Sequence, residues 1–235
     1  MQESPYVKKK NKMVKRFNKV SASIENKISK YYDSIFAKKI REESKVVFEK
    51  IIPQIPYYPG KINIFRQIVV ICSWAIAFYK PMKKHNKTVD ETILIFYEYV
   101  EELHMKIPRI FRWIIRHIFF SYLFFKIVQA SARNISKSPD GGEVEYFRKK
   151  DEKCDLMLIG DNCPIVNFFH NLGVSEMAFY CNFIDYIQSK IFGLGMIQEA
   201  CFGAGDDKCI SCMKKGRKTE VPKNLKGLLE KIESI

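Results

Sequence analysis

The chain has 235 residues, of which 47% are hydrophobic and 14% aromatic, so it is long and apolar enough to bury a core. Its formal net charge is +14, and basic residues are densest at positions 8–19. Such a charge attracts anionic partners, but the chain has no helix-turn-helix, zinc-finger or RNA-recognition signature. We therefore expect no nucleic-acid binding, and a solvated lysine-rich surface is the simplest interpretation.

Cysteine usage and the N-terminal sequence indicate the compartment. The seven cysteines are an odd number, and their spacing does not match a small disulfide-rich secreted scaffold. No apolar stretch follows the N-terminal charges as it does in a secretory signal. We therefore expect reduced thiols in a cytoplasmic protein.

Helices are expected throughout the first half of the chain. Apolar residues recur with a period of about 3.6 over residues 23–52. Three prolines followed by Gly60 end that helix, because proline cannot continue the hydrogen-bond ladder. A second helix is expected over residues 62–80. Thr88 and Glu91 have the S/T-x-x-E form of a capping box, which predicts the start of a third helix.

A long apolar stretch occupies residues 109–129. Three arginines, Arg109, Arg112 and Arg116, recur on one face of a helix, and Lys126 interrupts the far end. These charges argue against a membrane-spanning segment. The pattern predicts one continuous amphipathic helix that packs in the core. Two alternatives stay open, namely peripheral contact of this helix with a membrane and a lid over an apolar ligand.

The second half of the chain combines short strands with short helices. Turn-forming residues at 136–142 separate it from the helical half. Two alternating segments predict a hairpin, two helices follow it, and two further strands precede a terminal amphipathic helix. In chain order these elements are expected at residues 143–148, 155–159, 163–173, 176–192, 195–203, 208–215 and 222–235.

The fold class that follows is α+β. We expect a helical N-terminal half packed on a C-terminal antiparallel sheet of about four strands with flanking helices. Within this single composite domain we distinguish four regions. They are a basic flexible segment (1–22), a helical region (23–135), an α+β region that carries the ligand and catalytic residues (136–218) and a C-terminal helix (219–235).

Three short motifs follow one another in the α+β region. They are Cys163-Pro164, Cys181-x-x-x-Asp185 and Gly205-Asp-Asp-Lys-Cys209. In this order they resemble the bacterial L-2-amino-thiazoline-4-carboxylic acid hydrolase family, over residues 143–213. Residues 195–209 also resemble the end of the vinyl-reductase-type small-molecule-binding domain. Cys209 is followed here by Ile-Ser-Cys, where the family pattern has an acidic or small residue and then an aromatic one.

The resemblance implies hydrolytic opening of a cyclic amidine, at a C–N or C–S bond, linked to cysteine metabolism. Cys163 directly precedes the first turn of a helix, where the helix dipole favours a thiolate, so it is the expected nucleophile. Cys181 and Asp185 are four residues apart and share one helix face. There the thiol would attack or bind while the carboxylate holds an amidinium or positions water. The alternative for each cysteine is an inert buried thiol.

Four further residues are candidates for substrate binding. Glu199 and Cys201 are two residues apart on an expected strand, hence on one face, where the carboxylate meets either solvent or a polar pocket. Asp206 suits the following turn, and otherwise it would bind a cation or a substrate amine. Cys209 comes next on the last strand. Cys209 and Cys212 form the one C-x-x-C pair of the chain, and a zinc site would need a second pair. We therefore expect no metal and no cofactor.

Two functions remain. The first is a hydrolase that opens a cyclic amidine. The alternative is a non-catalytic protein of the vinyl-reductase-type domain that binds a hydrophobic small molecule. Both have a small molecule as partner, and assembly into a homo-oligomer stays open in either case.

Overall fold

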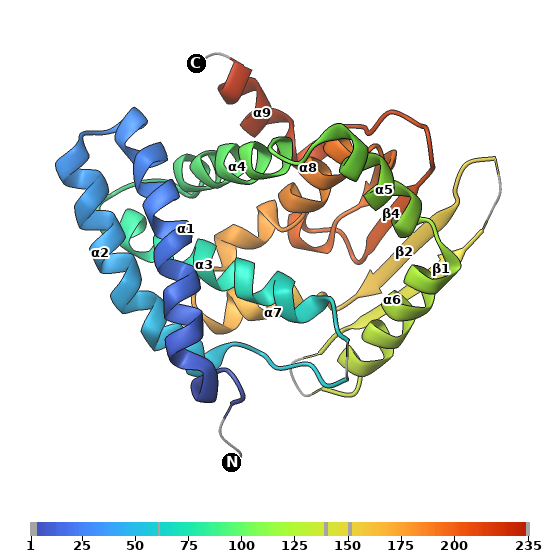
Figure 1. Ribbon diagram of the computed structural model, residues 1–235, viewed down its shortest axis with the longest axis horizontal. Helices are drawn as coiled ribbons and strands as arrows, with labels where there is room; N and C mark the ends of the chain where they lie inside the picture. Colours follow the sequence, from blue (N-terminus) through green and yellow to red (C-terminus); the bar gives the residue numbers. More distant parts are fainter. Residues whose placement is uncertain (1–3, 61, 139–140, 150–151, 234–235) are drawn as a thin grey trace. The chain divides into compact units, whose positions relative to one another are not determined.

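The computed structural model describes residues 4–60, 62–138, 141–149 and 152–233. The chain forms two compact units, and their residues alternate along the sequence. The first unit contains Met1–Tyr57 and Arg66–Tyr99, and the second contains Tyr58–Phe65 and Val100–Ile235. Helices make up the first unit, whereas the second combines helices with an antiparallel sheet (Figure 1). The expected α+β fold class is confirmed.

The first unit begins with two long antiparallel helices, α1 and α2, and two more helices follow them. A 3₁₀ turn, Val7–Lys9, leads into α1, and another, Ile52–Gln54, follows α2. The last helix, α4, runs on into the second unit. The helices are α1 (Lys10–Tyr31), α2 (Ser34–Ile51), α3 (Phe65–Lys84) and α4 (Val89–Met105).

Four buried aromatic rings form the centre of the first unit. Phe17 of α1 stacks on Phe48 of α2 with 4.4 Å between ring centroids. Phe78 of α3 lies 5.6 Å from Phe17 and 5.7 Å from Phe96 of α4. Such ring pairs add about 1 kcal/mol each to the free energy gained by burying the rings. The rings thus join all four helices.

The structure differs from the sequence expectation at the N-terminus. Residues 1–22 were expected to form a flexible segment, but α1 begins at Lys10, and both Met13 and Phe17 are buried. The single helix expected over residues 23–52 is also interrupted, at Tyr32 and Asp33. Tyr32 is extended, and the Asp33 side chain caps α2 by accepting the Phe36 N–H at 2.7 Å. The N-cap at Asp33 therefore starts a new helix, although the apolar periodicity continues through this point.

The capping box that opens α4 is confirmed. The Glu91 carboxylate accepts the Thr88 N–H at 2.7 Å, and the Thr88 hydroxyl oxygen accepts the Glu91 N–H at 3.2 Å. Both bonds satisfy backbone groups that have no partner within the helix. The helix expected over residues 62–80 corresponds to α3, which starts at Phe65 and continues past Pro81 to Lys84.

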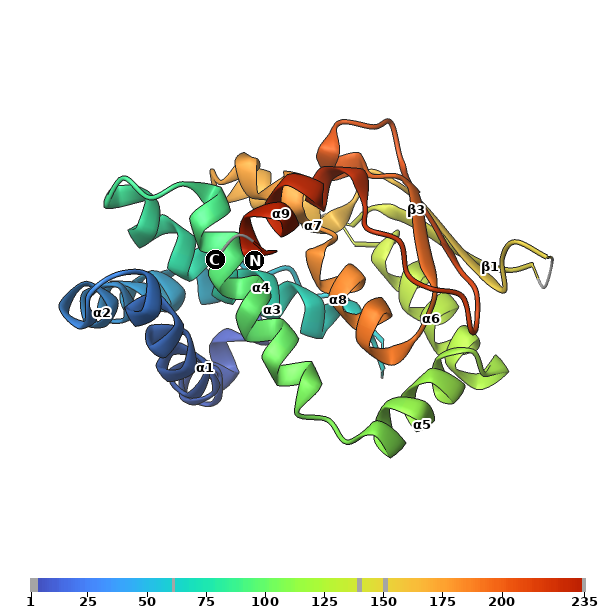
Figure 2. The ribbon, with the colours of Figure 1, turned by 90° about the horizontal axis from the view of Figure 1, so that it is seen from above.

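The second unit places its helices around a four-stranded sheet. The sheet has the order β1-β2-β4-β3, and all neighbouring strands are antiparallel. Helix α6 packs against β1, and α5 packs against α6 and α8 (Figure 2). The strands are β1 (Glu143–Arg148), β2 (Leu156–Asp161), β3 (Met196–Ala200) and β4 (Cys209–Met213). The helices are α5 (Arg109–Phe119), α6 (Tyr122–Ile135), α7 (Pro164–Asn171), α8 (Phe183–Phe192) and α9 (Lys226–Glu233).

Two helices that the sequence pattern treats as continuous are interrupted in the second unit. The stretch from residue 109 breaks at Phe120 and Ser121, where the Ser121 hydroxyl accepts the Phe124 N–H and caps α6. The helix expected over residues 176–192 is a 3₁₀ segment, Ser175–Tyr180, followed by α8. Cys181 therefore lies just before α8, which carries Asp185.

Core packing of the whole 109–129 stretch is not what the structure shows. No residue of α5 is buried, whereas α6 buries Phe125 and Val128. In the described parts of the chain, no helix combines the length and apolarity that a membrane crossing requires.

A β-bulge separates two residues that were expected to share a strand face. Gln198 pairs with Ser211 and Ala200 pairs with Ile210, so Glu199 is the extra residue. An extra residue reverses the alternation of faces beyond it. As a result Glu199 is exposed and Cys201 is buried, which corrects the prediction that they line one face.

Removal of the Phe17 ring should destabilise the first unit strongly. Phe17→Ala leaves a cavity between Phe48 and Phe78, and we expect a loss of about 3–5 kcal/mol in the free energy of unfolding. Urea denaturation followed by circular dichroism measures it. The control is Lys15→Ala on the exposed side of the same helix, for which we expect little change. Equal stability of both variants would mean that residues 10–22 are not part of the folded core.

Candidate functional site

Four cysteines from separate segments of the second unit meet in one place. Cys163 is the N-cap of α7, Cys181 follows the 3₁₀ segment, Cys201 follows β3 and Cys209 begins β4. The sulfurs of Cys181 and Cys201 are 3.7 Å apart, and the Cys209 sulfur interacts by hydrogen bonds with the thiols of Cys163 and Cys201. We call these four residues the thiol cluster. All seven cysteines of the chain are free thiols.

The connection between β3 and β4 is shaped to bring the thiols together. The Asp206 carboxylate accepts the Cys201 N–H at 2.7 Å, and the Cys201 carbonyl accepts the Ala204 N–H at 2.9 Å. A Cβ atom at Gly203 would lie 2.1 Å from the Ala178 carbonyl oxygen and 2.8 Å from the Cys181 sulfur. Only glycine allows the loop to approach so closely. Asp206 thus serves the turn, as one of its two expected roles.

The Cys209 sulfur is the best site for a negative charge in the thiol cluster. Hydrogen bonds from the thiols of Cys163 and Cys201 lower its pKa, and burial only partly opposes them. The backbone N–H of Phe202, at 3.2 Å, and that of Gly203 also donate to this sulfur. Donors that favour the ionised form are the general cause of a depressed thiol pKa. Of the four thiols, Cys209 is therefore the one at which these donors favour the ionised form.

The neighbouring thiols keep their protons. The hydrogen bond to Cys209, followed by burial, raises the pKa of Cys163 well above its usual range. The hydrogen bonds to Cys181 and Cys209 raise the pKa of Cys201 in the same way. The depressed pKa that the position of Cys163 at a helix N-terminus predicts is therefore wrong. The helix end does help, through the Val166 N–H, but Cys209 competes for the same charge and has more donors.

Asp185 adds a carboxyl group to the site. Burial, together with the charge of Cys209, raises the pKa of Asp185 to about 7. Asp185 is nevertheless an exposed residue, so a small molecule can reach its carboxyl group. A carboxyl group of this kind exchanges a proton near neutral pH, which is what a general acid or base requires.

Tyr146 is a site residue that the sequence analysis missed. It lies on β1, and burial followed by the charges of Asp185 and Cys163 raises its pKa. The phenol therefore stays protonated, and it lies within electrostatic range of Asp185 and Cys163. The alternating sequence of β1 could have indicated this residue. Residues 144, 146 and 148 lie on one face of the strand, and this face is less exposed than the other.

The remaining predicted residues lie apart from this arrangement. Glu199 is exposed at the β-bulge. Cys212 is directed away from the cluster, as expected for a residue three positions along the strand from Cys209. Its thiol donates to the Lys153 carbonyl at 3.1 Å. The structure thus groups Asp185 with the four thiols and leaves Glu199 outside.

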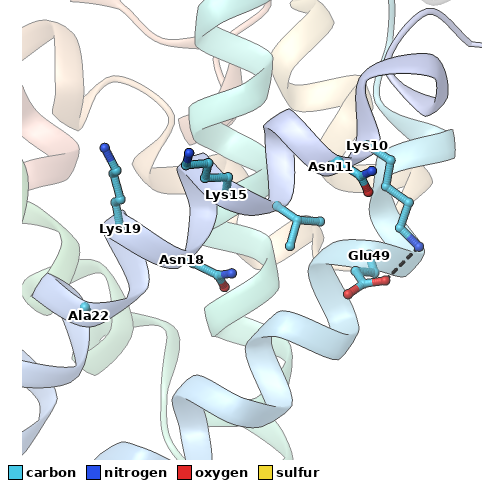
Figure 3. Close-up of a pocket in the computed structure, with 8 residues that line it drawn as sticks. Lys10, Asn11, Lys15, Asn18, Lys19, Ala22 and Glu49 are labelled. Atoms are coloured by element: carbon cyan, nitrogen blue, oxygen red, sulfur yellow. Dashed lines mark ion pairs between the residues drawn. The ribbon is translucent and has the colours of Figure 1, made fainter.

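Other features of the described residues do not resemble a catalytic site. Among the residues placed by the structure, no group of three or more His, Cys, Asp or Glu side chains is arranged to hold a metal ion. A shallow groove of about 730 Å³ runs between α1 and α2 of the first unit (Figure 3). Lys15 and Lys19 line it, and Lys10 forms an ion pair with Glu49 at 2.7 Å. The groove presents charge but no nucleophile.

Comparison with known proteins adds no name to this site. No protein-family model, no curated protein and no solved structure matches the chain. The function of the chain must therefore be inferred from the chemistry of the thiol cluster, Asp185 and Tyr146.

Alkylation should identify the ionised cysteine. Because hydrogen bonds lower the pKa of Cys209, we expect iodoacetamide to modify Cys209 first, at a rate that changes little between about pH 5 and pH 8. An ordinary thiol would react roughly tenfold faster with each pH unit in this range. Peptide mapping by mass spectrometry measures both the site and the rate. First modification at Cys163 would reverse the assignment of the thiolate.

Proposed function

We propose that the protein is a thiol-dependent hydrolase that opens a small cyclic amidine, such as a 2-aminothiazoline carboxylate. The observation that carries this proposal is the thiol cluster, in which one hydrogen-bonded thiolate lies in the electrostatic field of a carboxyl group with a raised pKa. The motif order described above supports the same reaction class. The positive net charge of the protein favours the approach of a substrate carboxylate.

The two acidic groups have different roles because their environments shift their pKa values in opposite directions. Donors lower the pKa of Cys209, and burial raises that of Asp185. This is the arrangement by which enzymes separate a nucleophile from a proton donor. We accordingly assign Cys209 as the nucleophile and Asp185 as the acid. The nucleophile differs from the one inferred from sequence, which was Cys163, and Asp185 was expected there to hold an amidinium or to position water.

The reaction proceeds in two balanced steps. In the first, the Cys209 sulfur adds to the amidine carbon, the bond from that carbon to the ring nitrogen or sulfur breaks, and Asp185 gives its proton to the departing atom. In the second, the Asp185 carboxylate takes a proton from water, and the resulting hydroxide displaces the Cys209 thiolate. One water is consumed, and both groups return to their starting protonation states.

The other members of the site act on these two groups. The thiols of Cys163 and Cys201 donate to Cys209, so they hold the sulfur in place between turnovers. Cys181 contacts Cys201 and keeps it within the cluster. Tyr146, whose pKa burial raises, supplies a neutral donor for the polar atoms of the substrate. These three cysteines are positioning residues in the proposal.

Substitution of the nucleophile tests the proposal directly. For Cys209→Ser with a 2-aminothiazoline carboxylate as substrate, we expect kcat to fall by a factor of about 10² or more, because serine is not ionised at neutral pH. Product formation is followed by mass spectrometry and binding by calorimetry. The control is Cys212→Ser on the same strand, which we expect to leave kcat within about twofold. Binding without turnover by the unmodified protein would favour a non-catalytic ligand-binding role instead.

The pH dependence tests the role of Asp185. The mechanism starts with Asp185 protonated, and its pKa is raised to about 7. We therefore expect kcat/KM to fall as the pH rises through about 7, and Asp185→Asn to remove this descending limb while lowering the rate by about 10²-fold or more. A profile that rises through pH 7 would instead indicate that the carboxylate form is required. Asp207→Asn in the neighbouring turn is the matched control.

A further inference from the structure

An unusually apolar surface lies where α5 meets α6. Seven large apolar side chains within fourteen positions are between 37% and 71% exposed. Single exposed apolar residues are common on protein surfaces, but a contiguous group of this size marks an interaction site. We call this group the apolar patch, and it consists of Ile110, Phe111, Trp113, Ile114, Ile118, Tyr122 and Leu123.

The patch follows one side of α5. Ile110, Ile114 and Ile118 recur at intervals of four and Trp113 is three positions after Ile110, so the four residues form one stripe along the helix. The helix is eleven residues long, which is about half of what is needed to cross a bilayer. It can therefore lie along an apolar boundary but cannot pass through it.

The arginines of α5 explain why its apolar side faces outward. Arg112 donates through Nε to the Ile107 carbonyl at 2.6 Å and through Nη2 to the Met105 carbonyl, at the end of α4. Arg116 lies beside Gly193 at the end of α8, since a Cβ there would be 3.3 Å from its Nη1. Both cations lie against the carboxyl ends of helices, where positive charge is favoured. The polar side of α5 thus packs on protein and leaves the apolar side uncovered.

Charge around the apolar patch indicates which occupant fits it. No acidic residue occurs between Glu102 and Asp140, whereas this part of the sequence contains seven basic residues. Arg109 at the start of α5 and Lys126 in α6 are both exposed, and the Lys126 ammonium lies 5.2 Å from the ring centre of Tyr122. An occupant must therefore be apolar inside and anionic at its edge. A bilayer that contains anionic lipid has both properties.

We propose that α5 and the first turn of α6 dock the protein on an anionic lipid bilayer, with α5 lying in the plane of the membrane surface. Trp113 and Tyr122 suit the interfacial region, because their rings are apolar while their polar atoms stay hydrated. Arg109 and Lys126 contact the lipid phosphates. This inference does not depend on the proposed hydrolase activity.

Flotation with lipid vesicles tests the docking. We expect the full chain to float with vesicles of phosphatidylcholine and phosphatidylglycerol, and to bind vesicles of phosphatidylcholine alone much more weakly. Ile118→Ser should lower the partition coefficient roughly tenfold, because the isoleucine side chain that would enter the bilayer is replaced by a polar one. The control is Ile35→Ser, which removes an even more exposed isoleucine side chain from α2. If the two variants bind alike, charge alone drives the binding and the proposal fails.

Two further measurements locate the contact. Vesicles with brominated acyl chains should quench tryptophan fluorescence, and Trp113→Phe should abolish most of that quenching, because Trp74 is buried. Arg109→Gln should weaken binding about fivefold at low salt and less at high salt, while Lys38→Gln on α2 should not. Quenching that persists in Trp113→Phe would place the contact elsewhere and overturn the proposal.

The main competing occupant is a second copy of the chain. Light scattering without lipid distinguishes the two, because a dimer through the apolar patch would revert to a monomer in Ile118→Ser. That result would overturn membrane docking. A molar mass that is the same for the unmodified chain and for Ile118→Ser supports it.

Discussion

The hydrogen bonds that end on the Cys209 sulfur are the interactions on which the candidate site depends. Two backbone N–H groups and two thiols are directed at one atom, and together they replace the water that would otherwise solvate a thiolate. The backbone donors come from Phe202 and Gly203, so the loop after β3 must fold tightly enough to reach back to the start of β4. The close approach at Gly203 and the Asp206 cap supply that geometry.

One negative charge among four thiols determines the properties of the neighbouring groups. Negative charge on Cys209 stabilises the protonated forms of Cys163 and Cys201, which donate hydrogen bonds to it. The same charge favours the neutral form of Asp185, so the pKa values of all three groups are raised. The charge is therefore localised, although several groups of similar intrinsic acidity surround it. In the mechanism that we propose, this arrangement would hold a nucleophile and a proton donor together near neutral pH, which neither an isolated thiol nor an isolated carboxylate would do.

The exposure of the apolar patch also results from two interactions that compete for one helix. A wide apolar stripe normally turns toward the core, as the sequence analysis expected for residues 109–129. In α5, Arg112 instead donates to carbonyls at the end of α4 and Arg116 lies beside the end of α8, so the helix can present only one side to the protein. Favourable charge at two helix ends thus leaves apolar area in water. A surface in this state is stabilised when a membrane or another apolar surface covers it.

Features that depend on a few neighbouring residues were determined by the sequence itself. The capping box of Thr88 and Glu91, the strands of the second half, the turn before β4 and the α+β class all follow from local hydrogen bonds and alternation. The tertiary structure alone decided the bulge at Glu199, the ionisation of Cys209 in preference to Cys163, the presence of Tyr146 and the outward side of α5. Each of these depends on groups distant in sequence that compete for one hydrogen bond, one charge or one packing surface. The outcome of such a competition is set by distances that only the folded chain defines.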